Sequence, residues 1–317
     1  MKTFWHTLRK PILGLAPMDG ITDPAFRAVV DDIGHPSVLY SEFVSAEGLN
    51  RNFKRLLRIF MTHQTATPFV GQLFGADAIA MEEAASILLE KTFVSGIDIN
   101  MGCPNRHVTG SGGGAALIFN PKLARKLIQA VRKAVTQSKK PIGISVKTRL
   151  GIDSVVTESW IPNLLEEQPD AIALHGRTLK QLFTGHADWN EIHKAARIAQ
   201  KTKTLLLGNG DISSFPCAQE HIKKYSPDGI LIGRATFGNP WIFQNISPDL
   251  RTRIHTAIHH IHLFHALTPD GNPLSLRKHL AWYIKGFPDA SLIRQKIIKL
   301  STTKQMLDFL SSLPYSD

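Results

Sequence analysis

Eight short apolar runs between residues 12 and 233 constrain the fold of this chain more than any other feature. Each run is rich in aliphatic and β-branched residues and is followed by a turn and a helical pattern. Strands that are apolar along their whole length and alternate with helices are typical of a parallel sheet covered by helices. The predicted strands span residues 12–16, 38–43, 69–73, 97–100, 142–147, 171–175, 204–208 and 229–233.

Eight such units in about 240 residues match the closed (β/α)8 TIM barrel. The competing architecture, an open doubly wound sheet, favours a Gly-x-Gly-x-x-Gly turn after the first strand, and the sequence has Pro17 and Met18 there instead. Asp23 and Pro24 then predict the start of the first helix, with Asp23 as its cap. We therefore predict an α/β fold with a TIM barrel over residues 1–245.

The pattern changes after Pro240, where strand-like runs stop. Three helices are predicted, over residues 250–266, 275–286 and 290–312, because proline and glycine interrupt the pattern between them. Residues 246–317 are thus predicted to form a small helical domain. Its cations outnumber its carboxylates and are Arg251, Arg253, Arg277, Lys278, Lys285, Arg294, Lys296, Lys299 and Lys304.

The charge balance indicates a polyanionic partner. Lys and Arg number 37 against 26 Asp and Glu, which gives a formal net charge of +11. Such an excess is typical of proteins that bind nucleic acid, although a solvated basic surface gives the same count.

The cysteine content points to a reducing compartment. Only Cys103 and Cys217 occur, and no Cys-x-x-Cys or Cys/His finger spacing is present, which argues against a zinc or iron–sulfur site. No apolar run reaches the roughly 18 residues of a membrane span, and the N-terminus lacks a signal peptide pattern. We expect a cytoplasmic, monomeric protein with no membrane association and no protein partner.

Polar or otherwise special residues follow almost every predicted strand. In a barrel the carboxyl ends of the strands meet at one face, which carries the chemistry. Any one of these residues has a structural explanation, but their convergence on one face is difficult to explain by packing. They are Pro17, Met18, Glu42, Gln72, Asn100, Cys103, Lys147, His175, Arg177, Asn209, Gly210, Asp211, Gly233 and Arg234.

The loop that holds Cys103 is the most distinctive of these segments. Cys103 lies between Gly102 and Pro104, just past a strand, rather than among apolar neighbours as a buried structural cysteine would. A thiol with an ordinary pKa near 8.5 can donate a proton, whereas a depressed pKa would make it a nucleophile. The glycine-rich run 110–115 beside it predicts a flexible loop.

The remaining strand ends predict a site for a phosphorylated ligand. Residues 208–211 and 233–234 follow strands seven and eight, where barrels usually bind phosphate through glycine backbone and arginine. Lys147 and His175 are placed to stabilise negative charge on an electron-rich ring such as a reduced flavin, and Gln72 to hydrogen-bond its edge.

Taken in order, these segments resemble the tRNA-dihydrouridine synthase family. The resemblance covers nearly the whole chain and is specific. It rests on residues 15–23, Ser41-Glu42, Gln72, 100–104, 146–149, 175–178, 209–211, 232–234, 277–279 and Trp282-Tyr283.

The resemblance implies an FMN-dependent reduction of uridine to 5,6-dihydrouridine in the tRNA D-loop. NADPH, or NADH, would be the electron donor, and Cys103 would donate the proton to uracil C5. Asn100 and Arg177 would hold the uracil, and Arg277 and Lys278 of the helical domain would bind tRNA. The implied FMN-binding residues are Pro17, Met18, Asp19, Gln72, Lys147, His175, Asn209, Gly210, Asp211, Gly233 and Arg234. Residues 110–115 resemble the branch of the family that modifies position 16.

Two alternatives remain open from the sequence. A flavoprotein similar to dihydroorotate dehydrogenase would share the barrel and a Cys-Pro-Asn loop, but a free pyrimidine does not require a basic helical domain. A tRNA-binding protein without catalysis would not need Cys103, Lys147 and the phosphate loops.

A histidine run in the first C-terminal helix also invites a metal interpretation. His255, His259 and His262 would share one helical face. The run contains no carboxylate, so we predict a polar, pH-sensitive face and no metal. Cys217 is predicted to be structural, and Trp241 and Phe243 to pack at the junction of the two domains.

Overall fold

The computed structural model describes residues 2–314. Residue 1 of the predicted barrel domain and residues 315–317 of the predicted helical domain lie outside the described range. Eight parallel strands form one sheet with the order β1-β8-β7-β6-β5-β4-β3-β2. The predicted parallel α/β fold is confirmed. The strands are β1 (Ile12–Leu15), β2 (Leu39–Ser45), β3 (Phe69–Phe74), β4 (Gly96–Met101), β5 (Gly143–Arg149), β6 (Ala171–His175), β7 (Leu205–Asn209) and β8 (Gly229–Ile232).

The sheet closes where β1 meets the start of β2. The Leu15 N–H donates to the Val38 carbonyl at 3.0 Å, and the Ser37 N–H donates to the Leu13 carbonyl at 2.7 Å. Gly14 permits this approach, because a Cβ atom there would lie 2.6 Å from Val38 Cγ1 and 2.7 Å from Leu231 Cδ2. The sheet is therefore a closed TIM barrel with its carboxyl ends at one face.

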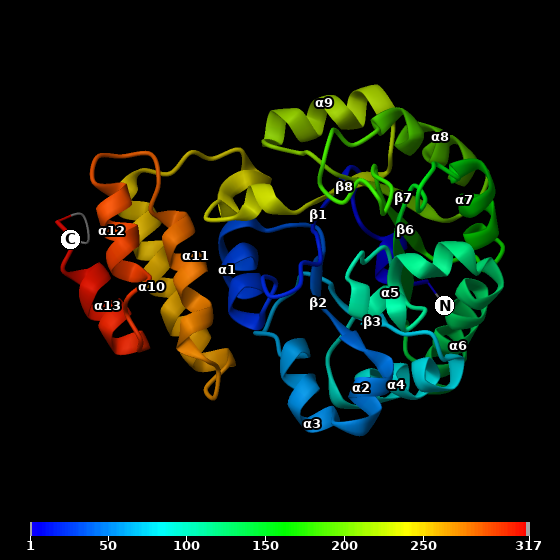
Figure 1. Ribbon diagram of the computed structural model, residues 1–317, viewed down its shortest axis with the longest axis horizontal. Coiled ribbons are helices and arrows are strands. Elements are labelled where there is room, and N and C mark those ends of the chain that lie inside the picture. Colours follow the sequence, from blue (N-terminus) through cyan, green and yellow to red (C-terminus); the bar gives the residue numbers. More distant parts are fainter. Residues whose placement is uncertain (1, 315–317) are drawn as a thin grey trace.

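Helices wrap the barrel and cover its outer face (Figure 1). Asp23 caps the first of them by accepting from the Phe26 N–H, as predicted, and Pro24 occupies the first turn. The helices of the barrel part are α1 (Pro24–Gly34), α2 (Ala46–Arg51), α3 (Phe53–Leu56), α4 (Ala78–Lys91), α5 (Arg106–Gly110), α6 (Pro121–Ser138), α7 (Thr157–Leu165), α8 (Trp189–Ala199) and α9 (Phe215–Tyr225).

The loop predicted over residues 110–115 is shorter in the structure and spans residues 111–113, and its flexibility stays a prediction. Residues 106–110 form α5, and Gly114–Phe119 form the 3-10 helix η3. Gly114 is buried at φ +57, where a Cβ atom would lie 2.6 Å from Val108 Cγ1 and 2.9 Å from the Cys103 carbonyl oxygen. Glycine is needed here for close packing against the cysteine loop rather than for mobility.

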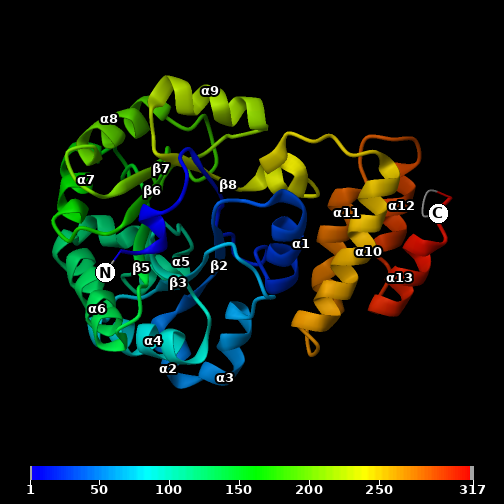
Figure 2. The ribbon, with the colours of Figure 1, turned by 180° about the vertical axis from the view of Figure 1, so that it is seen from behind.

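The C-terminal part packs beside α1 (Figures 1 and 2). Its helices are α10 (Leu250–Leu267), α11 (Leu276–Tyr283), α12 (Ala290–Ile297) and α13 (Thr303–Ser311). They share one apolar cluster with Ala25 and Val29 of α1 and with Trp241, so the helical part is anchored to the barrel. Trp241 and Phe243 are both buried near this junction, as predicted. The domain boundary at residue 245 stays a prediction.

The single helix predicted over residues 290–312 is wrong, since α12 and α13 are separate helices. Thr302 starts the second one through a capping box, in which its side chain accepts from the Gln305 N–H and the Gln305 side chain accepts from the Thr302 N–H. This break carries no glycine or proline, which explains why the apolar pattern alone did not predict it.

Candidate active site

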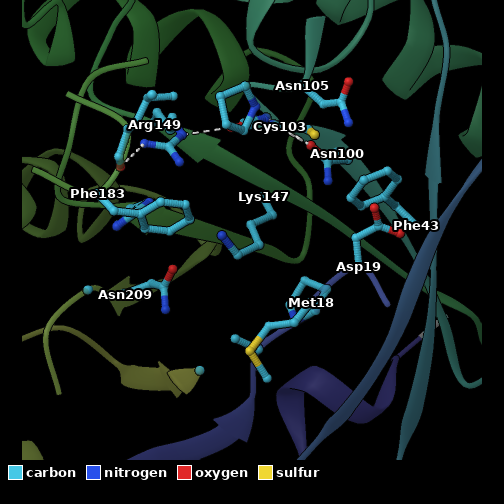
Figure 3. Close-up of a pocket in the computed structure, with 18 of the residues that line it drawn as sticks. Met18, Asp19, Phe43, Asn100, Cys103, Asn105, Lys147, Arg149, Phe183 and Asn209 are labelled. Atoms are coloured by element: carbon cyan, nitrogen blue, oxygen red, sulfur yellow. Dashed lines mark hydrogen bonds between the residues drawn. The ribbon is translucent and has the colours of Figure 1, made fainter. Parts of the chain in front are cut away.

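A cavity of about 1080 Å³ opens at the carboxyl ends of the strands (Figure 3). Its size is at the upper end of the range for small-molecule and cofactor sites. Twelve of the sixteen predicted site residues line it: Pro17, Met18, Asp19, Asn100, Cys103, Lys147, His175, Asn209, Gly210, Asp211, Gly233 and Arg234. The other four, Gln72, Arg177, Arg277 and Lys278, are not among its lining residues.

Asn100, at the end of β4, holds the backbone of the cysteine loop. The Asn100 Oδ1 atom accepts from the Gly102 N–H at 3.0 Å and from the Cys103 N–H at 2.8 Å. The Cys103 carbonyl accepts from the Ala115 N–H at 3.1 Å, which ties the loop to η3. Asn100 was predicted to hold a uracil; the structure shows that its amide oxygen is already engaged with the loop backbone.

The Cys103 thiol is placed to stay protonated. Burial raises its pKa, as does the nearby Asp19, while the Asn105 N–H and the Arg149 and Lys147 charges act in the opposite direction. The net direction is upward, so the group is a thiol at neutral pH. Of the two roles left open by the sequence, this environment favours the proton donor over the nucleophile.

Gln72 lies beneath the cavity rather than at its surface. Its side chain is fully buried, with Nε2 donating to Asp98 Oδ2 at 2.7 Å and Oε1 accepting from Asn100 Nδ2 at 2.9 Å. These contacts use one of the two Nε2 hydrogens and one of the two Oε1 lone pairs, so the hydrogen bond of Gln72 to a bound ring stays a prediction. In the structure Gln72 supports Asn100.

Lys147 and His175 differ in charge, although both were predicted as possible cations. Burial and the nearby Arg149 lower the pKa of Lys147 to about 8, against the opposing effects of Asp98 and Cys103, so it remains largely an ammonium at neutral pH. Burial and the charges of Lys147, Arg149, Arg177 and Arg234 lower the pKa of His175 to about 2. His175 is therefore a neutral imidazole in an electropositive cavity, and Lys147 carries the charge.

The predicted phosphate site lies where β7 and β8 end. Gly210 has φ +127, a conformation that favours glycine, and a Cβ atom there would lie 2.7 Å from Ala187 Cβ. The Arg234 side chain is 58% exposed, and its guanidinium lies 5.3 Å from the centre of the Phe183 ring. Gly233 and Asn209 also line this part of the cavity. The backbone of the two loops and the exposed Arg234 guanidinium are therefore available to an anion there.

Arg177 and Asp211 pair with each other beside the cavity. Arg177 is 2% exposed and donates to Asp211 Oδ2 at 2.7 Å. Burial would raise the pKa of Asp211, but the Ala187 N–H and Arg177 hold it below its ordinary value. Asp211 Oδ1 also lies 3.2 Å from the Arg234 guanidinium, so the carboxylate orients both arginines. The predicted contacts of Arg177 with a uracil and of Asp211 with a phosphate group stay predictions.

Arg149 is a cavity residue that the site prediction missed. It is 4% exposed, donates from Nε to the Gly102 carbonyl at 2.7 Å, and donates from Nη1 to the Thr178 carbonyl at 3.1 Å. Figure 3 shows it above Lys147, beside the cysteine loop. The signal was present in the sequence, because Arg149 is two residues after Lys147 on the same strand and so shares its face. A similar indication was present for Asp98, which is a carboxylate between two isoleucines of a buried strand.

Arg277 and Lys278 lie on α11, outside the cavity. The Arg277 Nε atom donates to the Leu300 carbonyl at 2.7 Å, which anchors it within the helical part. The Lys278 ammonium donates to the carbonyl of Gly20, in the turn that carries Met18 and Asp19 into the cavity. Lys278 thus contacts the rim of the site, a role that its place in the sequence did not suggest.

The histidine run is not a uniform polar face. His260 is fully buried and hydrogen-bonds through Nδ1 with the Tyr283 hydroxyl at 3.1 Å, whereas His259 Nε2 lies 2.8 Å from Asp32 Oδ2 of α1. The fold therefore brings to the run a carboxylate that the run itself lacks.

A second group of carboxylates and histidine lies nearby. Ligand atoms of Asp31, Asp32 and His63 lie within 4.8 Å of one another, and the 2.9 Å contact between His63 and Asp31 fits a hydrogen bond.

Within the described part of the chain, no helix combines the length and the apolar character that a membrane crossing requires.

The chain is similar to known proteins over most of its length. The chain matches the family model described as Dihydrouridine synthase (Dus) over residues 14–314. It is 32% identical over 335 residues to a probable tRNA-dihydrouridine synthase of Mycobacterium tuberculosis, covering 98% of this chain and 85% of that protein. It is 31% identical over 317 residues to the probable tRNA-dihydrouridine synthase 2 of Bacillus subtilis, covering 96% of this chain and 94% of that protein.

The match to a solved structure is more distant than these sequence matches. Nitroalkane oxidase from Streptomyces ansochromogenes superposes with a TM-score of 0.45 at 14% identity, over 80% of this chain and 72% of that chain. This likeness is too remote to bear on function. The sequence matches, by contrast, include the cysteine loop, the strand ends and the C-terminal helices.

Proposed function

The chain belongs to the dihydrouridine synthase family, and we propose that it reduces the C5=C6 bond of uridine in tRNA to give 5,6-dihydrouridine. The observation that carries this proposal is the pairing, in one cavity, of a protonated Cys103 thiol with an electropositive wall built from Lys147, Arg149 and Arg234. A proton donor opposite a site for an electron-rich, anionic ring is the arrangement that such a reduction requires.

FMN fits the donor set of the cavity. The cations around His175, which are Lys147, Arg149, Arg177 and Arg234, favour a bound anion. Gly210 and Gly233 also line the cavity, and without side chains their backbone is accessible to a phosphate. Lys147 and His175 would hold the polar edge of the ring, Pro17, Met18 and Asp19 would lie against it, and Arg234 would pair with the phosphate. When bound, FMN would supply hydride for uracil C6 after its own reduction by NADPH or NADH.

Cys103 would deliver the second hydrogen, as a proton from Sγ to uracil C5. Donation leaves a thiolate, and the positive charges of Arg149 and Lys147 lie close enough to favour that charged form. The hydrogen bonds from Gly102 and Cys103 to Asn100 hold the loop in place while the thiol changes its charge.

The net charge of +11 fits a tRNA substrate. The relatives named for tRNA modification support a cytoplasmic location. A uridine must leave its stack to reach a cavity at the barrel mouth, which costs a few kcal/mol, and phosphate contacts from basic side chains offset that cost. The cations of the helical part are the proposed source of such contacts. Residues 110–115 pack against the cysteine loop. The assignment to position 16 is supported by the sequence resemblance of this segment.

The proposal is tested by two measurements on the purified protein. It should show flavin absorbance, directly or after addition of FMN and removal of the unbound flavin by gel filtration, and with NADPH it should introduce dihydrouridine into unmodified tRNA. Protein that is colourless after this removal contradicts the cofactor assignment. Reduction of a free pyrimidine in place of tRNA, with no salt-dependent tRNA binding, would favour the dihydroorotate-dehydrogenase-like alternative.

A further inference from the structure

We propose that Asp98 is the positioning residue of the cysteine loop, acting through a chain of side-chain amides. The chain runs from Asp98 through Gln72 and Asn100 to the backbone of Gly102 and Cys103. The consequence for catalysis rests on the proposed function, whereas the positioning itself does not.

The chain is continuous and buried. Asp98 is 0% exposed and accepts from Ser145 Oγ at 2.6 Å and from Gln72 Nε2 at 2.7 Å. Gln72 Oε1 accepts from Asn100 Nδ2 at 2.9 Å. Asn100 Oδ1 then accepts from the N–H groups of Gly102 and Cys103 at 3.0 and 2.8 Å. Every link is of ordinary or short hydrogen-bond length.

The strand register explains why these residues meet. Gln72 on β3 is paired with Asp98 on β4, and Asp98 is paired with Ser145 on β5. Three neighbouring inward-facing positions therefore form one polar layer inside the barrel. Asn100 lies two residues beyond Asp98 on the same face, nearer the cavity.

Asp98 at one end of the chain and the backbone N–H groups of Gly102 and Cys103 at the other select the same direction for every hydrogen bond. A side-chain amide has one end that donates and one that accepts, so Gln72 and Asn100 could each be turned either way. An ionised carboxylate can only accept, which forces Gln72 to present Nε2 to Asp98 and Oε1 to Asn100. Asn100 must then donate through Nδ2, and its Oδ1 atom is left to accept from the cysteine loop.

The contacts of Asp98 fit an ionised group. Both are in the short range of charge-assisted hydrogen bonds. Burial raises the pKa of Asp98 to about 6, and the Ser145, Gln72 and Lys147 interactions limit the rise, so the carboxylate predominates at neutral pH. The reverse amide order would turn the Asn100 N–H₂ group toward two backbone N–H groups, leaving buried donors unpaired.

The rate of alkylation of Cys103 by iodoacetamide tests this inference on the protein as purified, in a Cys217→Ser background. The pH profile of the rate separates the thiol pKa from the reactivity of the thiolate. Asp98→Leu removes the acceptor at one end, so Gln72 Nε2 loses its partner, the amide order is held from the loop end alone, and the loop loosens. We expect the thiolate of this variant to react about five-fold faster, the size expected for loss of one hydrogen bond.

Three further variants serve as comparisons. Gln72→Leu interrupts the chain without touching Asp98 and should reproduce the faster reaction, which also covers the case in which Asp98→Leu does not fold. Asp98→Asn retains an acceptor for Gln72 while its amide donates to Ser145, so it should stay within about two-fold of the parent protein. Thr204→Val removes a different buried hydroxyl, which donates to the Pro169 carbonyl, and should have no effect.

Unchanged alkylation in both Asp98→Leu and Gln72→Leu would overturn the inference. An equal acceleration in Asp98→Asn would also overturn it, because the loss of charge rather than of amide order would then be the cause. The measurement needs neither flavin nor tRNA. A protein that lacks dihydrouridine synthase activity but shows the expected differences would contradict the proposed function and leave this inference standing.

Discussion

The ammonium group of Lys278, on α11, donates a hydrogen bond to the carbonyl oxygen of Gly20, in the turn after β1. Gly20 has φ +68, and the residues just before it, Met18 and Asp19, line the cavity. The Lys278 charge also lowers the pKa of Asp19, against the larger opposing effect of burial. The helical part therefore contacts the rim of the candidate active site directly.

Lys278→Met is expected to weaken both FMN retention and tRNA binding, because the β1–α1 turn loses its support from α11. The sequence resemblance implied only tRNA binding for Lys278. Lys304→Met, at an exposed position of α13, is the matched control and should retain FMN normally. Flavin fluorescence during dialysis measures retention. Loss of tRNA binding with unchanged flavin retention would show that Lys278 serves the RNA alone.

Cys103→Ala is expected to slow uridine reduction by about 10²- to 10⁴-fold, the usual contribution of a positioned proton donor. Reduction of the flavin by NADPH should persist, since Cys103 takes no part in it. Stopped-flow flavin absorbance and dihydrouridine content of tRNA separate the two reactions. Cys217→Ser, a thiol outside the cavity lining, is the control. Equal turnover in the two variants would remove Cys103 as the acid.

Arg234 and Arg177 should respond differently to mutation, because one is exposed and the other buried. Arg234→Ala removes a 58% exposed guanidinium, so it should weaken FMN binding about ten-fold or more with little loss of stability. Arg177→Leu leaves Asp211 without its buried partner and should lower the free energy of unfolding by at least about 2 kcal/mol. Isothermal titration with FMN and urea denaturation measure these effects. A reversal of the pattern would contradict the site as described.

The buried His260 is expected to make the protein less stable in acid. Burial lowers its pKa to about 3, so the folded state holds it neutral while the unfolded chain takes up a proton below pH 6.5. Its contribution is therefore fully present above pH 6.5 and is lost, by about 1.4 kcal/mol per pH unit, as the pH falls toward 3. His279, packed against it, should act in the same direction because its pKa is also lowered.

Urea denaturation of the parent protein and of His260→Leu between pH 7.5 and 5 measures this effect. The relevant quantity is the difference between the two free energies of unfolding at each pH. The comparison matters because Asp98 and Glu42, with pKa values raised to about 6 and about 7, act in the opposite direction in both proteins. Their contribution is fully present below their ordinary pKa values of 3.8 and 4.5, and it is lost as the pH rises from there through their folded pKa values of about 6 and about 7. A stability difference between the two proteins that does not change with pH would rule out His260 as a source of acid sensitivity.

The sequence by itself determined the barrel and most of its catalytic face. Parallel strands have one polarity, so residues that follow them, such as Cys103, Lys147 and Gly233, must meet at the same end once eight strands close. Capping residues such as Asp23 act within one turn, so they too could be recognised from neighbouring residues alone. These features depend on chain order and on local backbone geometry.

Only the tertiary structure decided how the polar side chains pair. Arg177 turns to Asp211, Gln72 to Asp98, and Lys278 to Gly20, which is 258 positions away in the chain. A long or two-ended polar group has several partners within reach, and the complementary polar group nearest to it in space selects one. That group comes from a distant part of the sequence, so no local pattern predicts it.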